Sequence, residues 1–277
     1  MGDRSRSSAG LPAGEALQSR DGLRIETRAS VVTLTLDRPD SLNALTLPLK
    51  VALLKALLAI ARSPSIRVVV LTGAGRAFCA GQDLAERAEP DAPPLEVELR
   101  ERYNPMVRAL RDLPQPVIAA INGVAAGAGA SLALASDLRI ASVDARFVLA
   151  FGRIGLVPDS GLTWLLPRLV GAARAAELAL VGDPLGANEA LAIGLVGRVV
   201  PAAELLPAAH VLADRIAEGP PRALAMTKRL LEAGWSTDLD EALEAEAAAQ
   251  GIAGASADHA EGLAAFREKR PPRFSGE

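Results

Sequence analysis

The sequence predicts an α/β fold with a helical C-terminal region. In the first 200 residues, short apolar segments typical of strands alternate with segments of helical period and with glycine-rich loops. Beyond residue 200 the composition shifts to alanine-rich segments of helical period. We therefore expect a disordered tail at residues 1–20, a core domain at 21–200 and a helical region at 201–277.

The first strand, helix and strand follow one another directly. Residues 30–36 are β-branched and roughly alternating, and the polar run at 37–40 then breaks the strand. Apolar residues recur at helical spacing over 45–60, and Ser-Pro-Ser at 63–65 ends that helix. Residues 67–72 are apolar on both faces and predict a second strand that runs into a glycine loop.

The middle of the chain contains a second glycine loop. Residues 86–98 are rich in charge and proline, and we expect a mobile surface loop that could act as a lid. A helix is predicted at 101–113 and a buried strand at 116–121. The glycine-rich stretch 122–131 then leads into a helix at 132–135.

The remaining elements are two short strands at 137–141 and 146–150, helices at 161–170 and 172–181, and a last strand at 195–200. Four helices complete the chain, at 202–217, 222–233, 239–249 and 257–269. Thr237 and Asp240 have the spacing of a capping box for the third of them. The alanine-rich helices could pack against a partner subunit or against their own core, and both interpretations remain open.

Composition excludes several classes of protein. The net charge is −3 with interspersed signs, so we expect no nucleic-acid partner. No apolar run is long enough to span a bilayer, the first 20 residues lack the apolar core of a signal peptide, and we expect a cytoplasmic protein. Cys79 is the only cysteine, which excludes disulfides within the chain and cysteine-based zinc sites. Aromatic residues make up 3%, so Ala, Leu, Val and Ile must build the core.

Both glycine loops, at 73–84 and 122–131, follow predicted strands and can expose backbone N–H groups. Two N–H groups that converge on one oxygen would form an oxyanion hole for an acyl group that becomes anionic. Alternatively, Gly127, Ala128 and Gly129 only allow a helix to pack tightly on the sheet. Neither loop has the G-x-G-x-x-G or G-K-[ST] pattern, so nucleotide binding is disfavoured.

The sequence gives little support for a nucleophile. The two histidines, His210 and His259, both lie in the helical C-terminal part, and no G-x-S-x-G motif is present. Cys79 has no nearby histidine in the sequence, and we expect a small buried thiol.

Asp159 lies in an apolar loop at 151–161 that carries no other acid. Leu156 and Val157 would desolvate its carboxylate and raise its pKa toward the range that suits a general acid or base. The alternative is a turn or N-cap aspartate before the helix at Gly161. For Asp83 we expect a role in fixing its own loop.

From residue 23 to 276 the sequence resembles the crotonase (enoyl-CoA hydratase/isomerase) superfamily. The motifs that carry the resemblance are Asp37-Arg38-Pro39 through Asn43-Ala44-Leu45, Phe78-Cys79-Ala80-Gly81-Gln82-Asp83-Leu84, Asn122-Gly123 through Gly129, and Ile154-Gly155-Leu156-Val157-Pro158-Asp159. The resemblance implies a spiral of ββα repeats, C-terminal helices that assemble a trimer or hexamer, and an acyl-CoA thioester bound between the glycine loops. It places the oxyanion hole at the backbone N–H groups of Ala80 and Ala128.

The residues are more similar still to the branch of ring-1,2-epoxyphenylacetyl-CoA isomerases of the phenylacetate pathway. Tyr103-Asn104-Pro105 and Val157-Pro158-Asp159-Ser160-Gly161 are among the shared motifs. The two glutamates that activate water in hydratases of the family are replaced by Ser131 and Phe151. In this branch a single aspartate, which matches Asp159, is the acid/base. Leu162 follows Gly161 at a position where proteins of this branch usually have a second glycine.

We therefore expect an acyl-CoA isomerase of fatty acid or phenylacetate metabolism, with Asp159 as acid/base and Ala80 and Ala128 as oxyanion donors. An enoyl-CoA hydratase and a non-catalytic acyl-CoA binding protein remain the alternatives. We expect no metal, and no cofactor other than the coenzyme A of the substrate. The expected substrate-binding residues are Ser41, Ala44, Gln82, Asp83, Leu84, Val124, Ser131, Phe151 and Pro158.

Overall fold

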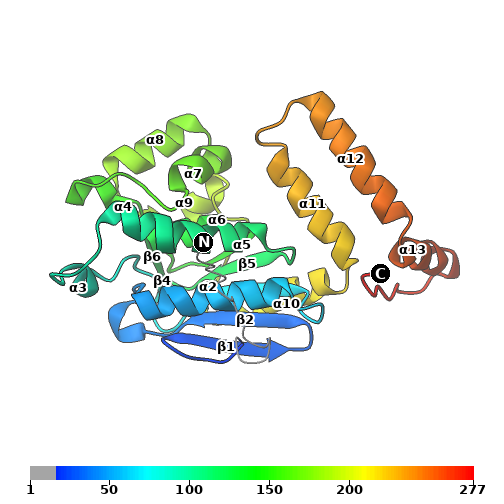
Figure 1. Cartoon of the computed structure of the whole chain (residues 1–277), viewed down its shortest axis with the longest axis horizontal. Helices are drawn as coiled ribbons and strands as arrows, with labels where there is room; N and C mark the ends of the chain where they lie inside the picture. Colours follow the sequence, from blue (N-terminus) through cyan, green and yellow to red (C-terminus); the bar gives the residue numbers. More distant parts are fainter. Residues whose placement is uncertain (1–16) are drawn as a thin grey trace, which may run out of the picture.

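The computed structural model describes residues 17–277, which form two sheets covered by helices (Figure 1). The larger sheet has the strand order β1-β2-β3-β5-β7-β10 and is parallel except for the β1–β2 pair. Its strands are β1 Leu23–Arg28, β2 Val31–Leu36, β3 Val68–Gly73, β5 Val117–Ile121, β7 Leu138–Ser142 and β10 Arg198–Val200. The smaller sheet contains β4 Ala77–Cys79, β6 Val124–Ala126, β8 Arg146–Val148 and β9 Leu185–Gly186.

The two sheets are built from one repeated unit. After each of the strands β3, β5 and β7, the chain crosses to the smaller sheet and forms β4, β6 and β8 in turn. Within each sheet, these three strands are neighbours and run parallel. Helices follow these strand pairs, and the expected spiral of ββα repeats is confirmed. The short strands β4 and β6 were not predicted, because three residues are too few to show a period, whereas β8 lies within the strand predicted at 146–150.

Helices cover the larger sheet on both faces. The helices of the core are α2 Leu47–Ala61, α5 Asn104–Asp112, α6 Ala128–Ala135, α7 Leu162–Val170, α8 Ala172–Val181, α9 Ala187–Ala192 and α10 Leu205–Ala217. The buried alanines Ala209 and Ala213 of α10 pack with Val68 and Ile118 of the sheet in a cluster of their own. Although α10 begins after residue 200, it therefore covers one face of the core sheet.

The last three helices form an arm beside the core (Figure 1). They are α11 Pro221–Ala233, α12 Leu239–Gly254 and α13 Ala257–Glu268. In α11 and α12 no residue is buried, while Leu231, Leu239 and Ile252 are exposed. Lys228 ties α11 to the core through an ion pair of 2.8 Å with Asp137.

The predicted capping box at the start of α12 is wrong by one residue. Asp238 is the N-cap, and its carboxylate accepts the N–H of Glu241 at 2.9 Å. Thr237 instead donates its hydroxyl to the carbonyl of Ala233 at 3.1 Å, which satisfies the end of the preceding helix. Aspartate and threonine are both good caps, so the spacing alone did not decide between them.

The expected mobile loop at 86–98 contains ordered structure. Two short helices, α3 Leu84–Arg87 and α4 Leu95–Glu98, lead into a π-helical turn at Leu99–Tyr103. Glu98 is buried and forms an ion pair with Lys50, which is buried in α2, and Arg102 contacts the same carboxylate at 2.5 Å. If the segment moved away from α2, the buried Lys50 charge would be left unpaired, which is energetically costly. The ion pair therefore fixes the end of the segment to α2.

Part of the expected tail at residues 1–20 is ordered. Residues 1–16 lie outside the described part of the chain. Ile25 donates its N–H to the hydroxyl of Ser19 at 2.9 Å, and Arg20 and Leu23 exchange backbone hydrogen bonds of 2.8 Å. The chain is therefore paired before residue 21.

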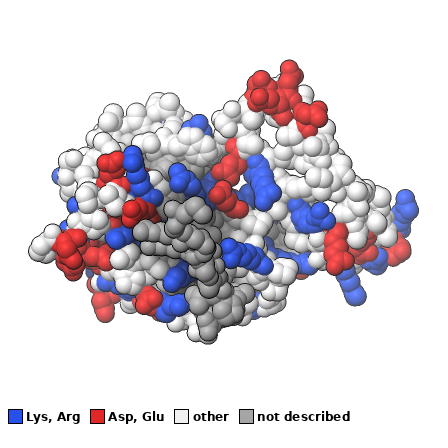
Figure 2. Space-filling view, viewed as in Figure 1, with Lys and Arg blue, Asp and Glu red and all other residues white. Residues whose placement is uncertain are grey.

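The surface carries charges of both signs. On the face shown in Figure 2, basic and acidic side chains are intermixed, and no continuous basic stripe crosses it. Within residues 17–277, none of the helices is both long enough and apolar enough to cross a membrane.

Candidate active site

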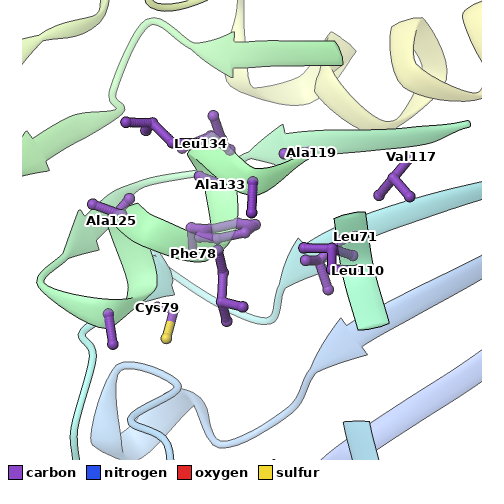
Figure 3. Packing of buried hydrophobic residues seen from close by; sticks show 14 of the residues in the cluster. Leu71, Phe78, Cys79, Leu110, Val117, Ala119, Ala125, Ala133 and Leu134 are labelled. Atoms are coloured by element: carbon purple, nitrogen blue, oxygen red, sulfur yellow. The ribbon is translucent and has the colours of Figure 1, made fainter. Parts of the chain in front are cut away.

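Two glycine turns meet where the parallel strands β4 and β6 end. These strands pair Cys79 with Ala125, so the turns that follow them leave the sheet side by side. A Cβ on Gly129 would lie 2.1 Å from the carbonyl oxygen of Cys79, and a Cβ on Gly81 would lie 3.3 Å from the backbone nitrogen of Ala128. Figure 3 shows Phe78 and Cys79 below the helix that carries Ala133. The glycines thus permit a contact between the two backbones.

The second turn aims the start of α6 at the first turn. Gly127 has φ 50° and ψ −125°, a conformation that residues with a Cβ rarely adopt. The N–H of Ala128 is the first of α6, where no carbonyl of the helix can accept it, and no other described residue accepts it. This N–H is a free donor at the positive end of a helix.

The first turn differs from the expected geometry. The N–H of Ala80 donates to the carbonyl of Leu42 at 2.9 Å, so two free donors are not present together in this structure. Leu42 and Asn43 both have left-handed φ angles, of 51° and 58°. Asn43 holds this turn in place, because its side chain accepts the N–H of Arg38 at 2.9 Å and donates to the carbonyl of Ala77 at 2.7 Å.

A cavity of about 990 Å³ opens beside the first turn. Six of the predicted site residues line it, namely Ser41, Ala44, Ala80, Gln82, Asp83 and Leu84. Asp83 pairs with Arg38 at 2.8 Å, which lowers the pKa of its carboxyl, and it also caps α3 by accepting the N–H groups of Ala85 and Glu86. The predicted loop-fixing role of Asp83 is therefore confirmed.

Asp159 does not cap a helix. The N-cap of α7 is Gly161, and the backbone carbonyl of Asp159 accepts the N–H of Leu162 at 2.9 Å in a turn. Its carboxylate accepts one side-chain hydrogen bond among the described residues, from the hydroxyl of Ser160 at 2.8 Å. Burial raises the pKa of the Asp159 carboxyl, and the Ser160 hydrogen bond opposes part of that rise.

The predicted desolvation by Leu156 and Val157 finds little support. Both side chains lie at the surface, Leu156 36% and Val157 77% exposed. A 3-10 helix at Ala150–Ile154 and a left-handed Gly155 reverse the chain ahead of these residues and leave them at the surface. The elements near Asp159 are instead α6, through Ser131, and the π-helical turn, through Tyr103.

Ser131 and Phe151, at the positions of the missing glutamates, both lie near the second turn and the start of α6. The hydroxyl of Ser131 is buried and donates to the carbonyl oxygens of Asp159 at 3.2 Å and Gly127 at 3.4 Å. The ring of Phe151 lies next to Gly127, where a Cβ would be 3.8 Å from its Cζ. Neither side chain offers a carboxylate to a water molecule.

The two remaining predicted residues do not line this cavity. Val124 is half-buried in β6, paired with Ala77 and Arg146, and it is not part of the cavity lining beside the first turn. Pro158 is half-buried and precedes Asp159 in the turn.

Sequence reasoning missed the part played by Tyr103. Its hydroxyl donates to Oε1 of Gln82 at 2.6 Å, and its ring is buried beneath Lys50, whose Nζ lies 4.9 Å from the ring centroid. Burial raises the pKa of the Tyr103 phenol, so it stays neutral. Its place in a shared Tyr-Asn-Pro motif was the available signal.

The histidines take no part in this site. His210 Nε2 lies 3.1 Å from the hydroxyl of Thr33 on the sheet, so its ring has a hydrogen-bonding partner away from the site. Within residues 17–277, no three His, Cys, Asp or Glu side chains are grouped to hold a metal ion.

Cys79 is expected to resist alkylation at neutral pH. The thiol is fully buried beneath the first turn, and burial raises its pKa to about 12. Thiolate is the reactive form, so the folded protein should gain no mass from iodoacetamide, whereas the urea-unfolded protein should gain one label. Rapid labelling of the folded protein would show that the turns above Cys79 open freely.

The fold and site together define an α/β protein in which two glycine turns meet and a half-buried aspartate is hydrogen-bonded to the helix that follows the second turn. Residues 26–277 match the Enoyl-CoA hydratase/isomerase family, and the chain belongs to this family. It is similar to the 1,2-epoxyphenylacetyl-CoA isomerase of Escherichia coli (strain K12), with 47% identity over 89% of this chain and 95% of that protein. A probable enoyl-CoA hydratase of Rhodobacter capsulatus is also 47% identical, over 92% of this chain and 98% of its own.

Solved structures agree. The enoyl-CoA hydratase from Bacillus anthracis superposes with a TM-score of 0.90 at 39% identity and covers 93% of this chain and 100% of its own. A structure described as a putative enoyl-CoA hydratase from Streptomyces coelicolor A3(2) gives 0.89 at 41%, over 99% of both chains. The predicted resemblance and fold class are confirmed.

Proposed function

We propose that this protein isomerises acyl-CoA thioesters by proton transfer through one aspartate. The observation that carries the proposal is the Asp159 carboxylate, which caps no helix, accepts one hydrogen bond among the described residues and is partly desolvated. The two positions that hold water-activating glutamates in hydratases carry Ser131 and Phe151. One carboxylate suffices to move a proton, whereas hydration must also position a water molecule.

The thioester oxygen accepts the free N–H of Ala128 at the start of α6. It accepts a second hydrogen bond from the N–H of Ala80. To donate to the substrate, this N–H gives up its hydrogen bond to the carbonyl of Leu42. Each such donor typically contributes about 2.7–4 kcal/mol to the stabilisation of an oxyanion. The exchange at Ala80 reduces the net contribution of that donor.

For a 3-enoyl-CoA, Asp159 removes the proton from C2. The electron pair of the broken C–H bond delocalises into the thioester as a dienolate, held by the backbone donors. The carboxylic acid then returns its proton to C4, which leaves the double bond between C2 and C3 and restores the carboxylate. The name of the Escherichia coli relative supports a ring epoxide as a second type of substrate.

The cavity beside the first turn, lined by Ser41, Ala44 and Leu84 among others, receives the part of the thioester next to the carbonyl. We propose that Ser131 and Phe151 shape the acyl side and that no cofactor beyond the coenzyme A of the substrate takes part. Val124 and Pro158 stay in this proposal as contacts at the margin of the site.

A hydratase is the second candidate, since the Rhodobacter capsulatus relative is named as a probable one. In that case a group other than a glutamate at 131 or 151 would hold the water.

One experiment separates the candidates. The purified protein is incubated in heavy water with a 3-enoyl-CoA and, separately, with a 2-enoyl-CoA, and the products are analysed by mass spectrometry. Isomerisation without formation of a 3-hydroxyacyl-CoA supports the proposal, and little deuterium should appear at C4 because Asp159 returns the proton that it removed. Formation of a 3-hydroxyacyl-CoA without isomerisation favours the hydratase, and binding without any product indicates an acyl-CoA binding protein.

We also propose that the protein works in the cytoplasm as a trimer or hexamer. The exposed apolar side chains of α11 and α12, which include Leu231, Leu239 and Ile252, favour burial against another subunit. Sedimentation analysis should show an oligomer, and a stable monomer would contradict this proposal.

A further inference from the structure

Asp159 is the first residue of a turn whose second residue, Ser160, has an unusual backbone conformation. Ser160 and Gly161 have left-handed φ angles of 53° and 83°, and the carbonyl of Asp159 accepts the N–H of Leu162 at 2.9 Å. Two left-handed residues in the middle of a turn are typical of type I′, where Gly, Asn and Asp dominate. A serine at the first of these positions is strained.

The strained serine is buried and points its hydroxyl at the carboxylate. Ser160 is 3% exposed, and its Oγ donates to Oδ1 of Asp159 at 2.8 Å. Glycine or asparagine would form the turn with less strain, but glycine has no group that could donate this hydrogen bond. Strain that is retained at one residue is commonly found where a site requires its geometry.

A second hydroxyl holds the same residue at its backbone. Ser131 of α6 donates to the carbonyl oxygen of Asp159 at 3.2 Å, and Ala128 opens the same helix three residues earlier. The backbone of Asp159 and the free N–H of Ala128 are therefore both tied to one helix. Among the described residues, no donor reaches Oδ2 of Asp159, so this oxygen is left for the substrate.

Building on the isomerase proposed above, we propose that Ser160 is a positioning residue for Asp159, because its hydroxyl fixes the carboxylate rotamer through Oδ1 and turns Oδ2 toward the acyl group. Ser131 has a different task, since it sets the position of the backbone and does not touch the carboxylate. Replacement of Ser160 and replacement of Ser131 should therefore change the pH profile of the enzyme differently, although both serines contact Asp159.

Few other groups can shape the titration of Asp159. The phenol of Tyr103 lies close enough to interact with the Asp159 carboxylate, but burial raises its pKa, so it stays neutral. Helix α6 carries no titratable residue. The Arg168 guanidinium of α7 lies over the ring of Trp164, 4.3 Å from its centroid.

The test compares the pH profile of kcat/KM on a 3-enoyl-CoA for the wild type, Ser160→Ala, Ser160→Gly and Ser131→Ala. The Ala variant keeps the strained backbone and the Gly variant relieves it, but both remove the hydroxyl. Both should lower kcat/KM about tenfold, as expected for one lost charge-assisted hydrogen bond. Both should also move the acidic limb to higher pH, because the hydroxyl stabilises the ionised carboxylate.

Ser131→Ala is the matched control, and its acidic limb should stay at the wild-type pH. An unmoved limb in both Ser160 variants, or an equal movement in Ser131→Ala, would overturn the proposal. The pKa of the Asp159 carboxyl can also be measured directly by a carbon-13 NMR titration, with the signal assigned by its loss in Asp159→Asn. This measurement does not depend on enzyme activity. If the wild type does not isomerise, the proposed function fails, but the titration still decides whether Ser160 acts on Asp159.

Discussion

Replacement of Asp159 by asparagine is expected to lower kcat for isomerisation by roughly 10²–10⁴-fold, the usual contribution of a positioned acid/base. Asparagine keeps the size of the side chain and can still meet the Ser160 hydroxyl, but it cannot accept and return a proton. The KM should change little, since the thioester is held by backbone donors. Initial rates on a 3-enoyl-CoA, followed by the absorbance of the conjugated product, measure both constants.

The pH dependence follows from the same residue. Asp159 must be ionised to remove a proton, and burial raises the pKa of its carboxyl. Activity should therefore be present above that raised pKa and decline as the pH falls through it, at a higher pH than for an ordinary aspartate. Asp144→Asn, which removes an exposed carboxylate outside the site, should leave rate and profile unchanged. Full activity in Asp159→Asn would refute the role of Asp159.

Gly129→Ala is expected to destabilise the protein by about 3 kcal/mol or more, at the upper end of overpacking costs. The new Cβ would lie 2.1 Å from the carbonyl oxygen and 2.7 Å from the Cβ of Cys79. These atoms belong to β4, so the contact can be relieved only if the two turns separate. Urea denaturation gives the loss in the free energy of unfolding, and any folded fraction should also lose kcat as the Ala128 N–H moves.

Gly251→Ala is the matched control for this substitution. Gly251 lies inside α12, and a Cβ there would meet nothing within 4 Å. Alanine in a helix interior is favoured over glycine by roughly 0.5–1 kcal/mol, so the control should be neutral or slightly stabilised. Equal stability of both variants would show that the turns do not meet as closely as described.

Much of the fold could be predicted because its signals are local. The period of α2, the apolar run of β5 and the glycine turns all depend on neighbouring residues. The ordering of residues 84–98 could not be predicted, because it depends on Glu98 meeting Lys50, 48 positions away in the sequence. Likewise, the composition of α10 resembles that of the arm, and only packing shows that it covers the sheet.

Six of the predicted site residues line one cavity, but the contacts of the candidate site were not predicted. The lining residues of the cavity follow from motifs, whereas the bond from Ala80 to Leu42 depends on two left-handed residues that no pattern revealed. The source of desolvation at Asp159 was assigned to its sequence neighbours, although the chain turns them outward. Ser160 is adjacent to Asp159 in the sequence, but the direction of its hydroxyl depends on the left-handed backbone conformation of Ser160, which no pattern indicated.

A crystal structure of the Asp159→Asn variant with a bound 3-enoyl-CoA tests the central claim most directly. We expect the thioester oxygen within hydrogen-bond distance of the backbone nitrogens of Ala128 and Ala80, with the contact from Ala80 to Leu42 lengthened. We also expect C2 of the acyl group next to the side chain at position 159. A thioester oxygen bound away from both turns, or an acyl chain that passes on the far side of position 159, would contradict the account.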